Sequence, residues 1–149
     1  MADKQRQGSS ESSARLAALA EQAVAAFREE NSEAYRELVE AFDGKSANIA
    51  VFGVGRFNVA VTDREVRIDQ SLKQSPDTAR GAIYPEAAVA ITEGRTSPLE
   101  SFFKGDLIAR APSPDLHRAY GYLVKFSDTA LRSERLQELA REFRSLADV

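Results

Sequence analysis

The stretch Gly94–Pro112 constrains the fold most, because it is predicted to end one helix, start another, turn and become a strand. Gly94 suits the position just past a helix C-terminus, where glycine adopts the left-handed conformation without strain. Ser97 is predicted to cap the next helix, with Glu100 as the third residue of a capping box. Gly105 is predicted to end that short helix. The stretch therefore indicates two helices followed by a strand.

After Gly105 the residues alternate between two sets, as in a strand with one inward face. Apart from Leu107, the inward-facing side chains are small. This strand is therefore predicted to leave space beneath it rather than fill it. The inward residues are Leu107, Ala109 and Ala111.

This segment resembles the one that marks the sterol carrier protein 2 family. The family pattern is a helix ending in glycine, a short helix ending in an aromatic pair and glycine, and a last sheet strand. The resemblance continues more weakly over residues 49–126. It implies an α+β fold: a mostly antiparallel, roughly five-stranded sheet, covered by helices around a hydrophobic tunnel. The matching residues are Gly94-Arg95-Thr96, Ser97-Pro98-Leu99 and Phe102-Phe103-Lys104-Gly105-Asp106-Leu107.

The family's ligands are sterols, fatty acyl chains and other lipids, so the resemblance implies a carrier of a sterol, a fatty acid or an acyl-CoA. It implies Tyr120 or Arg110 near a polar head group, with no covalent step and no cofactor. Ordinary core packing is the alternative for every candidate. The candidate ligand-binding residues are Leu99, Phe102, Phe103 and Leu107 in the motif, Tyr120, Leu123, Val124 and Phe126 in the following helix, and Phe57 and Val59 in the sheet.

Composition favours one ordinary globular domain of 149 residues with a net charge of −3. That charge gives no general attraction to nucleic acids or to anionic membranes. The chain has no cysteine, which excludes disulfides and thiolate metal sites. No apolar run reaches the roughly 20 residues of a spanning helix, and residues 1–15 lack the apolar core of a secretory signal. We therefore expect a cytoplasmic protein.

Apolar residues recur at helical spacing near both ends of the chain, and they alternate with polar residues in the middle, as in strands. Asn31 interrupts the first helical stripe, so residues 14–42 are predicted as one long helix or as two with Asn31 as a cap. The predicted organisation is a disordered tail over 1–13 and one domain over 14–149. That domain comprises a helical region over 14–44, a core over 49–126 and a C-terminal helix over 133–147.

Several local signals complete the prediction. The segment from Thr62 to Glu65 is typical of a hairpin turn. Ser113 and Ser133 are predicted helix caps. Gly121 lies inside a predicted helix, where close packing against a neighbour is favoured over a flexible point in a lid. The pair of glycines around Val54 indicates a turn rather than a nucleotide loop, because no third glycine opens a helix.

The search for reactive groups gives little. His117 is the only histidine, and its neighbours Ser113 and Asp115 point in different directions on a helix start. We therefore expect no enzyme activity, no catalytic residue and no metal site. The alternative to a lipid carrier is a non-catalytic adaptor that docks on a lipid-metabolising enzyme, or a homodimer, through its N-terminal helix. Transient membrane contact fits either function.

Overall fold

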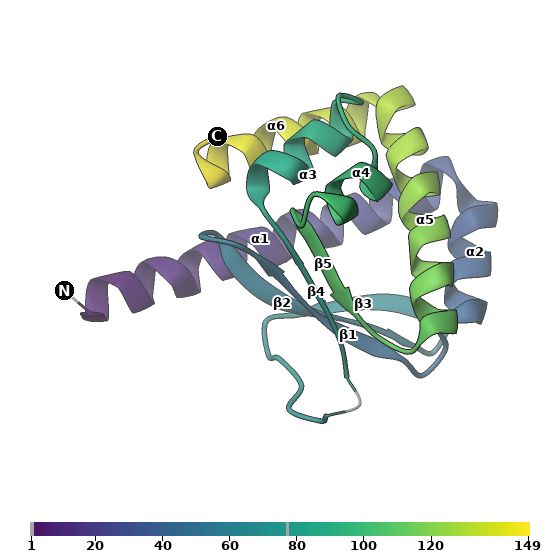
Figure 1. Cartoon of the computed structure of the whole chain (residues 1–149), viewed down its shortest axis with the longest axis horizontal. Coiled ribbons are helices and arrows are strands. Elements are labelled where there is room, and N and C mark those ends of the chain that lie inside the picture. The colour runs from purple at the N-terminus through teal and green to yellow at the C-terminus, as the bar shows by residue number, and fades with distance from the viewer. Residues whose placement is uncertain (1, 77) are drawn as a thin grey trace.

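The computed structural model describes residues 2–76 and 78–149 and shows one five-stranded sheet with helices packed on one face (Figure 1). The sheet order is β3-β2-β1-β4-β5. Only β1 and β4 pair in parallel; the other three pairings are antiparallel. The predicted α+β class with a mostly antiparallel five-stranded sheet is therefore confirmed. The strands are β1 (Ser46–Val51), β2 (Gly55–Thr62), β3 (Glu65–Asp69), β4 (Ala79–Ile83) and β5 (Leu107–Arg110).

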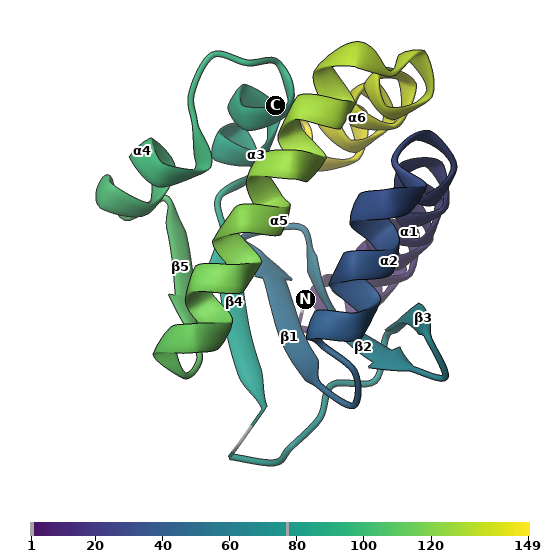
Figure 2. The ribbon, with the colours of Figure 1, turned by 90° about the vertical axis from the view of Figure 1, so that its right-hand side faces the viewer.

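Six helices surround this sheet in the described chain. They are α1 (Ala2–Glu30), α2 (Ser32–Ala41), α3 (Pro85–Thr92), α4 (Pro98–Phe103), α5 (Ser113–Arg132) and α6 (Glu134–Ala147). The long α1 runs along β2 and β3, whereas α4 projects at the opposite edge of the sheet, beside β5 (Figure 2). None of the helices in the described ranges combines the length and apolarity that crossing a bilayer requires.

The strand register divides the sheet into an apolar inner face and a polar outer face, because cross-strand partners lie on the same side. Val51 and Val61 of the inner face pack against α1, so this is the face that the helices cover. The inner face comprises Ala47, Ile49, Val51, Phe57, Val59, Val61, Val66, Ile68, Ala79, Gly81, Ile83, Leu107 and Ala109.

The core consists of separate apolar clusters arranged along α1. One cluster joins Phe27 and Val61 between α1, α2 and the sheet. Another joins α1 to α5 and α6 through Ala130 and Leu139. Phe126 packs against both of these clusters, and its ring lies 5.6 Å from that of Phe27. The second half of α5 is thereby fixed to α1.

The cap and turn predictions are largely confirmed. Gly94 has a φ of 76°, the left-handed conformation predicted for it, and Gly105, predicted to end the short helix, has a φ of 80°. The Ser97 side chain accepts a hydrogen bond from the Glu100 N–H at 3.1 Å. Asn31 caps α2 by accepting from the Ala34 N–H, so the N-terminal region is two helices.

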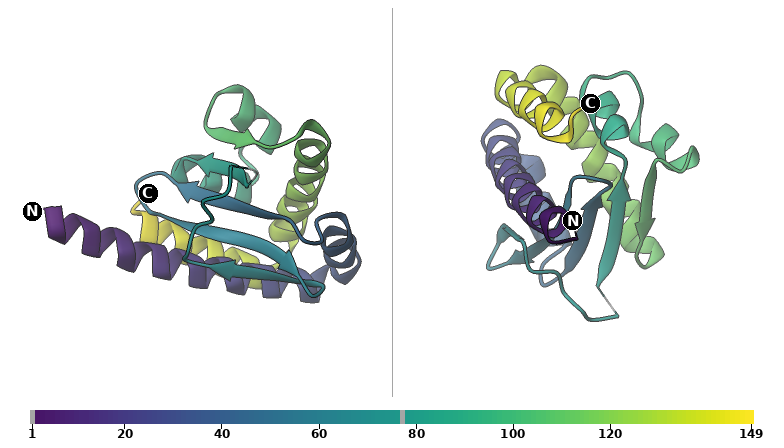
Figure 3. Two further views of the ribbon diagram at one scale, coloured as in Figure 1. Left: turned by 90° about the horizontal axis from the view of Figure 1, so that it is seen from below. Right: turned by 90° about the vertical axis from the view of Figure 1, so that its left-hand side faces the viewer.

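The N-terminal end differs from its prediction. Disorder is predicted for 1–13, but α1 begins at Ala2; Met1 lies outside the described residues. Figure 3 shows the first turns of α1 extending beyond the sheet. The Ser13 hydroxyl accepts a hydrogen bond from the Arg56 N–H at 3.1 Å, which holds the helix against β2. Polar composition alone does not reveal such a contact.

Two predictions on α5 are wrong. Ser113 is not its cap: the helix is preceded by Pro112, whose carbonyl accepts from the N–H groups of Asp115 and Leu116, and no side chain caps this end. Gly121 is not closely packed, because a Cβ added there would meet no atom within 4 Å. The pattern of apolar and polar residues does not show which atoms surround Ser113 and Gly121 in the folded chain.

We predict that Ser133→Ala lowers the free energy of unfolding by about 1–2 kcal/mol. The buried Ser133 hydroxyl accepts from the Leu136 N–H at 3.0 Å and donates to the Glu30 carboxylate at 2.7 Å. Ser113→Ala is the matched control and should change stability by less than about 0.5 kcal/mol. Urea denaturation of both variants measures the difference; equal effects would contradict the assignment.

Candidate functional site

The motif residues on α4 lie at the surface of the molecule. Leu99 and Phe102 are 44% and 46% exposed, and Phe103 is 78% exposed. The two phenylalanine rings meet edge to face with centroids 6.1 Å apart. The predicted ligand contact of these three side chains therefore stays a prediction, and the structure gives them an outward position.

The other predicted ligand residues lie on the sheet and on α5. Phe57, Val59 and Leu107 belong to the inner face of the sheet and are half-buried. On α5, Tyr120 is exposed, whereas Leu123 and Val124 are half-buried. Phe57 packs on the cluster around Leu16 and Phe126 on the clusters around α1, so these two also have ordinary core contacts.

An apolar region between the first half of α5 and β4–β5 is incompletely covered; we call it the α5 site. Ala109 lies on the inner face of β5, yet it is exposed. Ala119 is also exposed, although it is seven residues from Phe126 and so shares the inner side of α5 with it. Leu107, Leu116 and Leu123 are accessible in part. Side chains from the two elements therefore leave apolar surface open to solvent.

Small residues on the inner face explain this opening. Ala47 is the register partner of Ala79 in the parallel pair of β1 and β4, and Gly81 is the partner of Ala109 in β4 and β5. None of these side chains reaches far above the sheet. The prediction that β5 leaves space beneath the helices stays a prediction. Helical spacing places Ala119 on the apolar stripe of this helix with Leu116 and Leu123, but Ala119 was not among the predicted ligand-binding residues.

Polar contacts position α5 above the sheet. Asp115 in its first turn binds Lys45, just before β1, at 2.5 Å. Further along, Tyr122 packs edge to face on Phe42, and Lys125 donates to Glu37 at 3.0 Å. That hydrogen bond raises the pKa of Lys125 above its ordinary value. These contacts tie the helix to α2 and to the end of the sheet rather than to β4 and β5.

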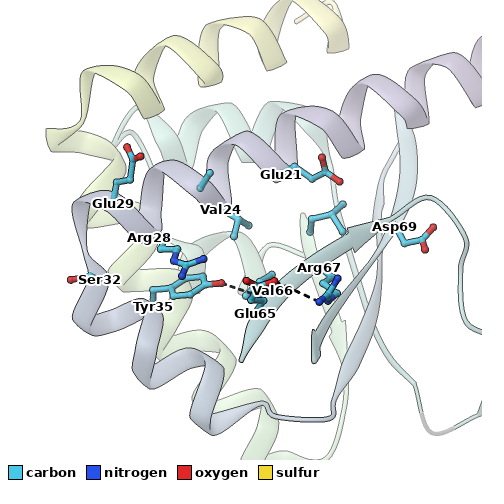
Figure 4. A pocket seen from close by; sticks show the side chains of 12 residues that line it. Glu21, Val24, Arg28, Glu29, Ser32, Tyr35, Glu65, Val66, Arg67 and Asp69 are labelled. Carbon is cyan, nitrogen blue, oxygen red and sulfur yellow. Dashed lines mark hydrogen bonds and ion pairs between the residues drawn. The ribbon is translucent and has the colours of Figure 1, made fainter. Parts of the chain in front are cut away.

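A concavity lies on the side of the molecule opposite the α5 site. It is a groove of about 950 Å³ between α1, α2 and the edge strand β3 (Figure 4). Val24, Val66 and Ile68 contribute its apolar surface, and charged side chains such as Glu21 and Asp69 surround them. The groove is wide and open, and the sequence analysis did not predict it.

Several polar groups of this groove contact one another or the strand backbone. The Tyr35 hydroxyl accepts a hydrogen bond from the Val66 N–H at 3.1 Å, on the free edge of β3. The Arg28 guanidinium lies 5.1 Å from the centroid of the Tyr35 ring. Arg67 forms an ion pair with Glu65 at 3.6 Å. Tyr35 therefore occupies a backbone donor that an added strand would need.

Reactive groups do not gather at either place. Among the side chains described, those of residues 10–76 and 78–149, no three His, Cys, Asp or Glu come together in a group that could hold a metal ion. His117 is exposed on α5, and the carboxylate of its neighbour Asp115 is bound by Lys45. The geometry of the α5 site is suited to contact with apolar surface.

Comparison with known proteins gives a likeness in fold. No family model matches the sequence, and no curated protein matches it. The solved structure of a protein named "UbiJ-SCP2 Ubiquinone synthesis protein" is similar, with a TM-score of 0.49 and 15% sequence identity. The match covers 68% of this chain and 84% of that chain.

We predict that Tyr35→Phe lowers the free energy of unfolding by about 1 kcal/mol, because the Val66 N–H loses its acceptor. Urea denaturation measures this loss, and amide hydrogen exchange at Val66 should become faster. Tyr120→Phe is the control, since its ring is exposed and the structure gives its hydroxyl no hydrogen bond. Unchanged exchange at Val66 in Tyr35→Phe would show that the hydroxyl does not protect the edge.

Proposed function

We propose that this protein binds a hydrophobic small molecule, such as a sterol, a fatty acyl chain or a related lipid, at the α5 site. The observation that supports it is the exposure of Ala109 and Ala119 on surfaces that face the interior. Apolar surface open to water is unfavourable by about 2.5 kcal/mol for each 100 Å². An apolar ligand that covers it would gain this free energy.

The binding energy would come from burial rather than from a reaction. Leu107 and Leu123 would contact the apolar part of the ligand, together with Leu116. Tyr120 is the polar side chain best placed near a head group, because it is exposed on the helix that borders the site. The proposal includes no covalent step, no cofactor and no metal, so the protein would act as a carrier rather than an enzyme.

A second candidate is an adaptor that docks through its N-terminal helix. Figure 1 shows the first turns of α1 extending past the sheet with no other element beside them. An adaptor would need this end of α1 to bind its partner and would not need the α5 site. Substitutions in the α5 site should therefore abolish the function of a carrier and leave the partner binding of an adaptor unchanged.

We predict that long-chain lipids raise the melting temperature of the protein, because a ligand that binds only the folded state stabilises it. At 100 times its Kd, a ligand contributes about 2.7 kcal/mol, which corresponds to an increase of several degrees for a domain of this size. Differential scanning fluorimetry would use oleic acid, cholesterol and a short-chain ubiquinone as probes. The quinone is included because the protein of similar fold is named for ubiquinone synthesis.

Two matched variants locate the ligand. Ala119→Phe places a ring in the α5 site, and Ala25→Phe places one in the groove beside β3; both alanines are exposed on helices. Ala119→Phe should weaken binding of the active probe by about tenfold or more, and Ala25→Phe should leave it unchanged. Weaker binding in Ala25→Phe with unchanged binding in Ala119→Phe would show that the ligand binds in the groove beside β3 instead. Melting curves of the wild-type protein that no probe shifts would contradict lipid binding.

A further inference from the structure

The backbone of β5 carries free hydrogen-bonding groups at one edge of the sheet. Residues of an antiparallel pair alternate between those that bond the neighbouring strand and those that do not. The Tyr84 N–H donates to the Asp106 carbonyl, so Asp106 and Ile108 direct their backbone groups toward β4. The N–H and C=O groups of Leu107 and Ala109 therefore point away from β4. No backbone or side-chain group of the described residues forms a hydrogen bond with them.

The other edge of the sheet lacks this opening. There the Tyr35 hydroxyl accepts a hydrogen bond from the Val66 N–H on the free side of β3. Proteins commonly protect exposed edges with prolines, inward-pointing charges or covering elements, because a free edge binds other strands. Between Leu107 and Arg110, β5 has neither a proline nor an inward charge. The two edges therefore differ, and β5 is the one suited to the addition of a strand.

Opposite charges lie at the two ends of this strand. Asp106 comes just before β5 and Arg110 ends it, with Ile108 halfway between them. Alternation places all three side chains on the outer face of the sheet. Arg110 is also the direct cross-strand partner of Arg80, and like charges in that arrangement destabilise a sheet. Neither Asp106 nor the two arginines form an ion pair with any described side chain, so each is free to pair with a charge on another molecule.

We propose that two copies of the chain pair through their β5 strands, antiparallel about a twofold axis at Ile108, to form one continuous sheet. This register places Leu107 of each copy opposite Ala109 of the other, so that their free N–H and C=O groups bond one another. It also places Asp106 of each copy opposite Arg110 of the other, as two ion pairs related by the axis. The pairing does not depend on the proposed lipid binding.

Neighbouring registers with the same backbone bonding fit less well. An axis at Leu107 would oppose Arg110 of one copy to Lys104 of the other, which places like charges together. An axis at Ala109 would oppose Arg110 to Ile108. A shift of the pairing by one residue would oppose outward-pointing backbone groups to groups that already bond β4. Backbone geometry and charge therefore select the axis at Ile108.

The helix α4 would enlarge this interface. It projects beside β5, at the edge that the second copy would join (Figure 2). Its side chains Leu99, Phe102 and Phe103 are exposed, and exposed apolar patches mark interaction sites. Because α4 precedes β5, the twofold axis brings it beside the end of β5 of the other copy. The pairing would also cover part of Ile108, the one large apolar side chain on the outer face of the described strands.

Sedimentation equilibrium of the full chain tests the pairing. The wild-type protein should form dimers whose proportion rises between about 5 and 500 µM, as expected of a small, reversible interface. Arg110→Asp and Asp106→Arg each turn both ion pairs into like-charge contacts, and should raise the dimer dissociation constant by about tenfold or more. An equimolar mixture of these two variants restores both ion pairs and should form heterodimers as stable as the wild-type dimer. Arg36→Asp is the control of equal charge change, because Arg36 is exposed on α2, away from β5.

Amide hydrogen exchange of the wild-type protein tests the same register without any substitution. Exchange at Leu107 and Ala109 should slow as the protein concentration rises, whereas exchange at Ile108, whose backbone groups already face β4, should change much less. Wild-type protein that stays monomeric, a dimer that Arg110→Asp leaves intact, or an equal loss in Arg36→Asp would overturn the proposal. So would charge variants that fold normally yet form no heterodimer when mixed, or exchange at Leu107 that does not depend on concentration.

Discussion

The packing of Phe126 against α1 is the contact on which the arrangement of the helices depends. Its ring meets Phe27 and joins the cluster beneath α2 to the cluster that holds α6. This contact fixes the second half of α5, whereas the ion pair between Asp115 and Lys45 fixes its first turn. Because α5 is held at its two ends and along α2, its inner side between these points is not forced onto β4 and β5. The exposed Ala119 of the α5 site lies on this unattached stretch of the helix.

Most local features of the fold could be predicted from the sequence because their causes are local. The left-handed glycine at Gly94, the cap at Ser97 and the break at Asn31 depend on backbone geometry and on neighbours within four residues. Where disorder is predicted for residues 1–13, the structure has α1 from Ala2, and the Ser13 hydroxyl contacts a strand far along the chain. The cap predicted at Ser113 was wrong because Pro112 provides the helix start through its carbonyl.

The candidate site was less predictable than the fold. An apolar residue at helical or strand spacing indicates an inward side, but not whether another element covers that side. Phe103 and Leu107 come from the same motif, yet one is 78% exposed and the other is half-buried. The groove beside β3 depends on how α1 and α2 pass an edge strand, and no short motif encodes that. Tertiary contacts, rather than residue type, decide which apolar side chains remain accessible.

The central claim is that the inner sheet face beneath α5 is open and accepts an apolar ligand. Isotope-filtered NMR with uniformly ¹³C-labelled protein and unlabelled oleic acid tests it most directly, because it reports the protein methyl groups that contact the bound chain. We predict intermolecular NOEs from the acyl chain to the methyl groups of Ala109, Ala119 and Leu123. NOEs confined to Val24 and Val66, or none from a bound chain to the α5 site, would contradict the claim.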